Sequence, residues 1–260
     1  MLASRMIGLE RRNPGRPSVV FLHGAGISSW MWRCQVQGLP ELDAVALDLP
    51  GHGVSIDRAW ESVSATAALV AAWIRSNATQ GKAHVVGLSL GGVVGLELAA
   101  QSPDVVDRLV TSGALGVGLP AAASLAWLME ATMPLARMPW ALRMSSRMLG
   151  LSAEDQAALG ADIERMPKGF IRQAVRGVAG FRITPALLAS PVPALVVAGT
   201  REYGGIKRTV TQLEANWPQA TGRLVPKASH VWNWEYPDRF DEMLRRWFLD
   251  HQAADWLRTP

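Results

Sequence analysis

Three residues that lie far apart in the chain could together perform nucleophilic chemistry: Ser89, Glu202 and His230. A serine hydroxyl is a poor nucleophile at neutral pH unless a neighbouring base removes its proton. An imidazole is the usual base, and a buried carboxylate holds that imidazole in the tautomer that can accept the proton. We therefore treat these three residues as candidates for one catalytic site and ask which elements could bring them together.

The segment around the serine has the pattern of an apolar strand, a turn and a helix that opens with small residues. It runs Val85-Val86-Gly87-Leu88-Ser89-Leu90-Gly91-Gly92 and contains Gly-x-Ser-x-Gly. This pattern is typical of a nucleophile elbow, a strained turn whose glycines let strand and helix cross closely. The free N–H groups at the start of the helix suit a developing negative charge. The alternative interpretation is a glycine turn with an incidental serine.

Apolar runs and turn signals alternate along much of the chain. We expect strands at residues 5–11, 18–22, 43–49, 82–88, 108–113, 194–198 and 223–225. We expect helices at residues 28–37, 62–76, 90–101, 207–216 and 238–251. This alternation predicts an α/β fold with a doubly wound, mainly parallel sheet and helices on both faces. Ligands of such sheets bind outside the carboxyl ends of the strands, where all three candidate residues fall.

The alternation stops between residues 115 and 189, a segment with helical periodicity, several prolines and many Met and Trp residues. We interpret it as a helical cap, inserted into an α/β core domain of residues 1–114 and 190–260, because the strand rhythm resumes afterwards. The alternative is a second helical domain with its own core. The inner surface of a cap would roof the site, so Trp127, Met133 and Trp140 are candidates for contact with a substrate.

Four ordered blocks resemble the α/β-hydrolase superfamily, and most closely its capped esterases. The blocks are His23-Gly24-Ala25-Gly26, Asp48-Leu49-Pro50-Gly51-His52-Gly53-Val54-Ser55, Gly87-Leu88-Ser89-Leu90-Gly91-Gly92, and Ser229-His230 followed by Glu235-Tyr236-Pro237. The order of serine, acid and histidine along the chain also matches that fold. The resemblance covers nearly the whole chain outside the predicted cap, and it does not fix a substrate.

The resemblance implies a role for each candidate residue. Ser89 would attack an acyl carbonyl to form an acyl-enzyme. His230 would take the serine proton and later return it to the leaving alcohol. The backbone N–H groups of Ala25 and Leu90 would form the oxyanion hole.

The acid is the point at which this chain departs from the family. Most members have aspartate where this chain has Glu202, although glutamate occurs elsewhere in this fold. The other family position for the acid follows the predicted strand 108–113, and this chain has Thr111 and Ser112 there. The alternative interpretation of Glu202 is a surface side chain beside Arg201.

Residues next to the oxyanion loop and next to His230 complete the predicted pocket. The expected lining residues there are His23, Gly24, Trp30, Met31, Val231 and Trp232. Their character favours a small to medium, largely apolar acyl or alcohol group. His52 is expected to make structural hydrogen bonds rather than to transfer protons.

Composition sets broader limits on this chain of 260 residues and net charge +4. We expect no nucleic-acid partner, because no basic cluster alternates with aromatic residues. Arg143 and Arg147 are interpreted as the solvent-facing side of a helix. No two histidines have the i, i+4 spacing of a helical metal site, and we expect neither a metal nor a cofactor. Cys34 is the only cysteine, which excludes an intramolecular disulfide, and we expect it to be buried.

The first ten residues lack the apolar core of a signal peptide, and no apolar run is long enough to span a membrane. We therefore expect a cytoplasmic protein that acts on a small-molecule ester; thioesters, lactones and amides stay open. Two other functions also stay open. One is a lyase or cofactor-free oxygenase that uses the same three residues to abstract a proton. The other is a non-catalytic small-molecule receptor. The sequence does not indicate the oligomeric state.

Overall fold

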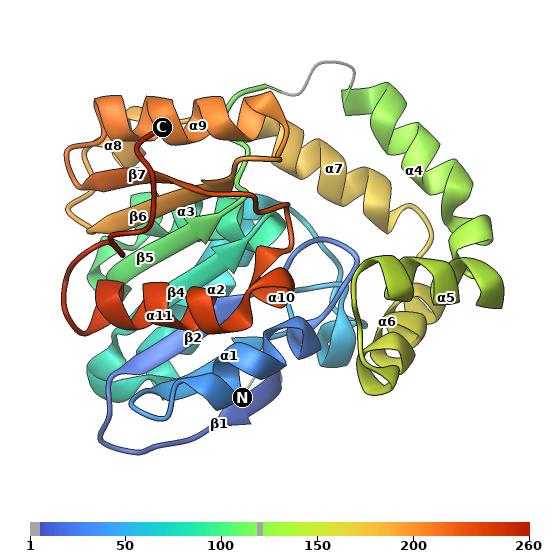
Figure 1. Ribbon diagram of the computed structural model, residues 1–260, viewed down its shortest axis with the longest axis horizontal. Coiled ribbons are helices and arrows are strands. Elements are labelled where there is room, and N and C mark those ends of the chain that lie inside the picture. The colour runs from blue at the N-terminus through green and yellow to red at the C-terminus, as the bar shows by residue number, and fades with distance from the viewer. Residues whose placement is uncertain (1–5, 119–121) are drawn as a thin grey trace.

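A seven-stranded sheet forms the centre of the molecule (Figure 1). The computed structural model describes residues 6–118 and 122–260. The strands lie in the order β1-β3-β2-β4-β5-β6-β7, with β1 antiparallel to β3 and all other neighbours parallel. The strands are β1 (Ile7–Arg11), β2 (Ser18–Leu22), β3 (Asp43–Leu47), β4 (Ala83–Leu88), β5 (Val106–Ser112), β6 (Ala194–Gly199) and β7 (Ala220–Val225). The predicted α/β fold with a mainly parallel, doubly wound sheet is confirmed.

Helices connect the strands and cover both faces of the sheet. They are α1 (Arg33–Gly38), α2 (Val63–Asn77), α3 (Leu90–Gln101), α4 (Ala122–Ala136), α5 (Pro139–Met148), α6 (Ala153–Arg165), α7 (Phe170–Gly180), α8 (Pro185–Leu188), α9 (Gly204–Asn216), α10 (Trp232–Glu235) and α11 (Pro237–Phe248). None of the helices among the described residues has the length and apolar character that crossing a bilayer requires.

The strand β2 shows why the central strands are apolar throughout. Val20 and Leu22 pack in the same core as α2 and α3, whereas Val19 and Phe21 pack in the core beneath α1 and α11. Successive side chains point to opposite faces of a strand, and here helices cover both faces. An apolar residue is therefore needed at nearly every position, and all five residues of β2 are buried.

Several element boundaries differ from the predicted ones. Residues 28–37 form a short 3₁₀ turn, Ser29–Trp32, followed by α1, rather than one helix. The turn is held by Asp48, whose Oδ1 accepts a hydrogen bond from the Ser29 N–H at 2.7 Å. Cys34 is exposed on α1, so the expectation that it is buried is wrong. The predicted first strand began at Arg5, which lies outside the described residues.

Of the five helices between β5 and β6, three extend the molecule beyond the sheet. Figure 1 shows α4, α5 and α6 together at one end, with α7 leading back towards the sheet. Phe170 and Ile171 of α7 are buried in the same core as α2 and α3. The Trp30 Nε1–H donates to Asp162 of α6 at 2.7 Å, which joins this helix to the loop after β2. The division into a core and a cap of residues 115–189 stays a prediction, and residues 119–121 of that cap lie outside the described residues.

Candidate active site

Ser89 occupies the sharp turn between β4 and α3. Its backbone angles, φ 55° and ψ −113°, are rarely adopted by residues other than glycine. A side chain at Gly91 would collide with the Leu22 carbonyl oxygen, and one at Gly87 would collide with the Gly91 carbonyl oxygen. The close crossing of strand and helix therefore requires both glycines of the motif.

Backbone hydrogen bonds hold this turn against the neighbouring chain segments. The Ser89 N–H donates to the Ser112 carbonyl at 2.9 Å, which joins the turn to the end of β5. The Gly91 N–H donates to the His23 carbonyl at 3.0 Å, which joins it to the loop after β2. The strained conformation persists because the surrounding sheet fixes it on two sides.

Glu202 and His230 meet at the carboxyl ends of β6 and β7. The His230 Nδ1 lies 3.2 Å from the Glu202 Oε1. The glutamate side chain is 1% exposed and the histidine side chain is 42% exposed. Glu202 is thus a buried partner of the imidazole, not a surface side chain beside Arg201. With Nδ1 directed at the carboxylate, Nε2 is the ring nitrogen available to a second group.

Hydrogen bonds between two loops keep this pair together. The Arg201 N–H donates to the Ala228 carbonyl at 3.0 Å, which joins the turn after β6 to the loop after β7. The Ser229 N–H donates to the Glu235 carboxylate at 3.0 Å, and the Ser229 hydroxyl donates to the same carboxylate. These contacts explain the late sequence block, because Glu235 anchors the loop that carries His230.

Gly113 is a further residue of the site, and no motif in the sequence predicts it. It follows β5 with φ +65°, and a Cβ there would lie 2.7 Å from the His230 Cε1 and 3.2 Å from the Glu202 Oε1. Both the positive φ and the close imidazole call for glycine. The available signal was a glycine directly after an apolar strand, a feature shared by many ordinary turns.

Two buried histidines hold the loop that contains Ala25. Burial lowers the pKa of His23 to about 4 and that of His52 to about 3, so both rings are neutral at neutral pH. The His23 Nδ1–H donates to the Gly24 carbonyl at 2.8 Å. The Gly26 N–H donates to the His52 Nε2 at 3.2 Å. The two rings thus fix the residues on either side of Ala25, and His52 has the structural role that the sequence predicts.

One cavity contains both Ser89 and His230. Its volume is about 390 Å³. The other lining residues are mostly apolar. They come from the loop after β2, the end of β4, the helices α4, α6, α7 and α10, the residue after α5 and the loop after β7. They are Gly24, Ala25, Ile27, Leu88, Met129, Leu149, Leu159, Ala174, Val175, Val178, Val231 and Trp234. None of these residues is charged. In the ranges 6–118 and 122–260, no group of three or more His, Cys, Asp or Glu residues could hold a metal ion.

Two of the predicted pocket residues, Gly24 and Val231, line this cavity. Met31 and Trp232 do not, because both are buried in the core beneath α11, where the Trp232 Nε1–H donates to the Ser112 hydroxyl at 2.9 Å. His23 is fully buried behind the loop. Trp30 stacks on Trp234, with ring centroids 5.4 Å apart, and it is Trp234 that reaches the cavity.

The three predicted cap residues also lie elsewhere. Trp127 and Trp140 are 65% and 48% exposed, on the outside of α4 and α5. Met133 lines a separate small cavity beside Met166. The side chains from this segment that do reach the cavity include Met129 and Leu159. Periodicity identified the helices but not the face of each helix that meets the sheet.

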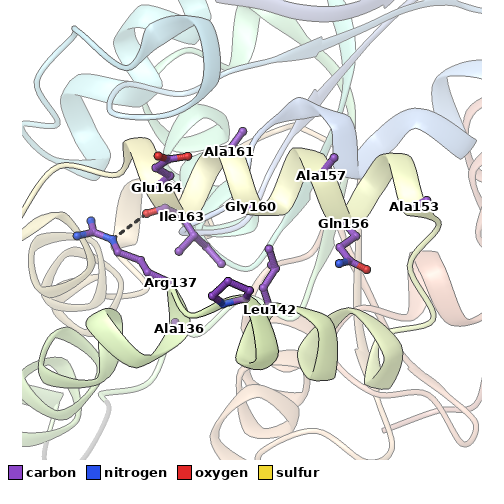
Figure 2. Close-up of a pocket in the computed structure, with 11 residues that line it drawn as sticks. Ala136, Arg137, Leu142, Ala153, Gln156, Ala157, Gly160, Ala161, Ile163 and Glu164 are labelled. Atoms are coloured by element: carbon purple, nitrogen blue, oxygen red, sulfur yellow. Dashed lines mark hydrogen bonds between the residues drawn. The ribbon is translucent and has the colours of Figure 1, made fainter.

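A larger cavity of about 740 Å³ lies between α5 and α6 (Figure 2). Leu142 and Ile163 project into it from opposite helices, and the Arg137 guanidinium at its edge donates to the Ile163 carbonyl at 3.2 Å. Neither Ser89, Glu202 nor His230 lines this cavity. The cavity with the candidate catalytic residues is therefore the smaller of the two.

Comparison with known proteins agrees with this geometry. The chain matches the alpha/beta hydrolase family over residues 19–243. An esterase of Mycobacterium tuberculosis is 42% identical over 99 residues, which are 36% of this chain and 32% of that protein, so the chain spans about a third of that relative. A pimeloyl-[acyl-carrier protein] methyl ester esterase of Pectobacterium carotovorum is 26% identical over 253 residues, 90% of this chain and 95% of that protein.

Among solved structures, a naproxen esterase of Bacillus subtilis has a TM-score of 0.71 at 20% identity, over 92% of this chain and 86% of that one. At that identity the likeness concerns the fold. The family match covers most of the chain and includes the segments that carry the elbow, Glu202 and His230. This protein therefore belongs to the alpha/beta hydrolase family of enzymes.

Proposed function

We propose that this protein is a serine hydrolase that cleaves a carboxylic ester through an acyl-enzyme on Ser89. The main support for this proposal is the arrangement of Ser89, His230 and Glu202. Ser89 and His230 line the same cavity, and the His230 Nδ1 lies 3.2 Å from the carboxylate of the buried Glu202. The relatives named as esterases support the same class of reaction.

In the proposed reaction, the His230 Nε2 removes the Ser89 proton as the serine oxygen attacks the ester carbonyl carbon. Glu202 fixes the tautomer of the ring and stabilises the imidazolium that forms. His230 then donates its proton to the departing alkoxide, which leaves as the alcohol. A water molecule, deprotonated by the same ring, attacks the acyl-enzyme, releases the carboxylic acid and restores the serine hydroxyl.

The oxyanion would lie between the backbone N–H groups of Ala25 and Leu90. Leu90 is the first residue of α3, where an N–H group has no carbonyl partner within the helix. Ala25 is held by the hydrogen bonds of His23 and His52 to its neighbours. Each donor of this kind lowers the barrier by about 3 kcal/mol.

The lining of the cavity supports an uncharged, largely apolar substrate of small to medium size. A volume of about 390 Å³ lies at the small end of the range of ligand sites. A carboxylate or ammonium group on the substrate would lose its hydration there without gaining a charged partner. Esters with short to medium acyl chains fit this lining best.

The proposal is tested with a series of p-nitrophenyl esters of graded acyl length. We expect hydrolysis of the short and medium esters and a falling kcat/KM for longer ones. Ser89→Ala should abolish turnover, whereas Ser102→Ala, at the far end of α3, should retain it. Hydrolysis of none of these esters by a folded protein would argue against the proposal and favour proton abstraction or simple binding.

A further inference from the structure

Exposed apolar side chains are concentrated in two helices beside the active-site cavity. Twelve large hydrophobic residues are exposed in the part of the chain that the structure describes, and nine of them lie between residues 127 and 149. Such residues usually occur singly on a protein surface, and a concentration of them marks a site that binds a membrane, another protein or a ligand.

The helix α5 presents one continuous face of this kind, the α5 face. It consists of Trp140, Arg143, Met144, Arg147 and Met148, which follow the i, i+3, i+4, i+7, i+8 spacing of one side of a helix. The two methionines are 52% and 80% exposed, and the tryptophan is 48% exposed. The other side of α5 faces the protein: Ala141 and Ser146 are buried, and Leu142 lines the cavity between α5 and α6.

The charged side chains of the α5 face are all positive. Helix α5 contains two arginines and no acidic residue. Both arginines are exposed, as the sequence predicts, and no ion pair or side-chain hydrogen bond to either occurs among the described residues. A surface that is both apolar and cationic is complementary to one that is both apolar and anionic.

We propose that the α5 face docks this protein onto an anionic lipid surface. The tryptophan and methionine side chains would enter the boundary between headgroups and acyl chains, and the guanidinium groups would bind lipid phosphates. A second copy of the chain fits the same face poorly. A two-fold contact would bring the arginines of one copy against the arginines of the other without an acidic residue of either helix between them.

The α5 face lies close to the cavity that contains Ser89. Met129 of α4 and Leu149, the residue after α5, are 40% and 36% exposed and also line the cavity that contains Ser89. A protein bound through α5 would therefore hold the cavity close to the lipid. The proposal concerns binding and goes beyond the proposed ester hydrolysis, so Ser89→Ala should bind lipid like the wild-type protein.

The test is flotation of the full chain with vesicles of phosphatidylcholine alone or with 30% phosphatidylglycerol, at low and physiological salt. We expect binding to the anionic vesicles that weakens with salt. Arg143→Gln/Arg147→Gln should weaken it by roughly thirtyfold, from about 1 kcal/mol for each arginine near an anionic surface. Met144→Ser/Met148→Ser should weaken it at least tenfold at both salt concentrations, because the apolar contribution is not screened.

Two matched variants control for net charge and apolar area. Arg16→Gln/Arg208→Gln removes the same charge elsewhere, and Leu249→Ser removes an exposed apolar side chain; both should bind like wild type. Three results would overturn the proposal: no flotation with anionic vesicles, flotation that the α5 variants leave unchanged, or a concentration-dependent dimer that Met144→Ser/Met148→Ser dissociates. The last result would assign the α5 face to a second copy of the chain.

Discussion

The two walls of the active-site cavity are built in different ways. The sheet-side wall carries Ser89 and His230, and their positions depend on backbone hydrogen bonds and on glycines where a Cβ would lie too close to neighbouring atoms. The helical wall consists of apolar side chains from α4, α6 and α7. The first wall tolerates little change, because its contacts fix the candidate catalytic residues. The second could vary in size and shape without moving those residues. We infer that the sheet side determines the rate of the chemical step and the helical side determines the choice of substrate.

The largest difference should come from Glu202→Gln. The amide keeps the size of the side chain but favours the wrong imidazole tautomer, so we expect kcat for a short p-nitrophenyl ester to fall by about 10³–10⁴ with little change in KM. Glu242→Gln, on the exposed side of α11, is the control and should retain wild-type kcat. A kcat within tenfold of wild type for Glu202→Gln would show that another group orients His230.

A smaller effect is expected from Gly113→Ala. The new methyl group would press on the His230 ring, and the positive φ of residue 113 would add about 1 kcal/mol of strain. We expect kcat to fall by roughly 10–100-fold, measured with the same ester. Gly150→Ala is the matched control, since residue 150 has a similar φ of +67° and nothing lies within 4 Å of a Cβ there. Equal kcat values for the two variants would contradict the tight packing of the imidazole.

The pH dependence of the free energy of unfolding tests whether the buried His52 supports the loop that contains Ala25. Burial lowers the pKa of His52 from 6.5 to about 3, so the unfolded chain gains a proton there well before the folded chain does. The stabilisation is complete above pH 6.5 and is lost as the pH falls towards 3. Below about pH 5.5, each further drop of one pH unit should lower the free energy of unfolding by roughly 1.4 kcal/mol through this histidine.

His52→Gln should remove that contribution, so for the variant the free energy of unfolding, measured with urea between pH 4 and 5.5, should change with pH by about one proton less than for wild type. Val54→Ser, at an exposed neighbouring position, should keep the wild-type slope. Parallel curves for wild type and His52→Gln would mean that the ring is protonated in the folded protein as readily as in the unfolded one.

The smallest effect concerns the helical wall. Val178→Phe would fill part of the cavity, so kcat/KM should fall several-fold for medium acyl chains and hardly at all for acetate esters. Met133→Phe, beside the separate small cavity, should leave the ratio between the two esters unchanged. If Val178→Phe lowers kcat/KM equally for all chain lengths, the helical wall does not select the substrate.

The difference between the two walls also explains which parts of the site could be predicted from the sequence. The elbow glycines and the histidine blocks are local sequence patterns, and each is typical of one backbone geometry. The sheet could be predicted because apolar runs alternate with turn signals. Gly113 and Trp234 belong to the site only through tertiary contacts, and no local pattern distinguishes them. Nearness in sequence also misled, since Trp232 follows His230 by two residues yet is buried in the core beneath α11. For the helices, the sequence indicates helical structure but not how each helix is rotated against the sheet.

Covalent labelling with a fluorophosphonate, followed by intact-mass and peptide mass spectrometry, directly tests whether Ser89 is the nucleophile. We expect one adduct per chain, on the peptide that contains Ser89. We also expect ester hydrolysis to be lost in step with labelling, and Glu202→Gln and Gly113→Ala to be labelled more slowly than wild type. Ester hydrolysis that persists in the fully labelled protein, or an adduct on another residue, would contradict an acyl-enzyme on Ser89.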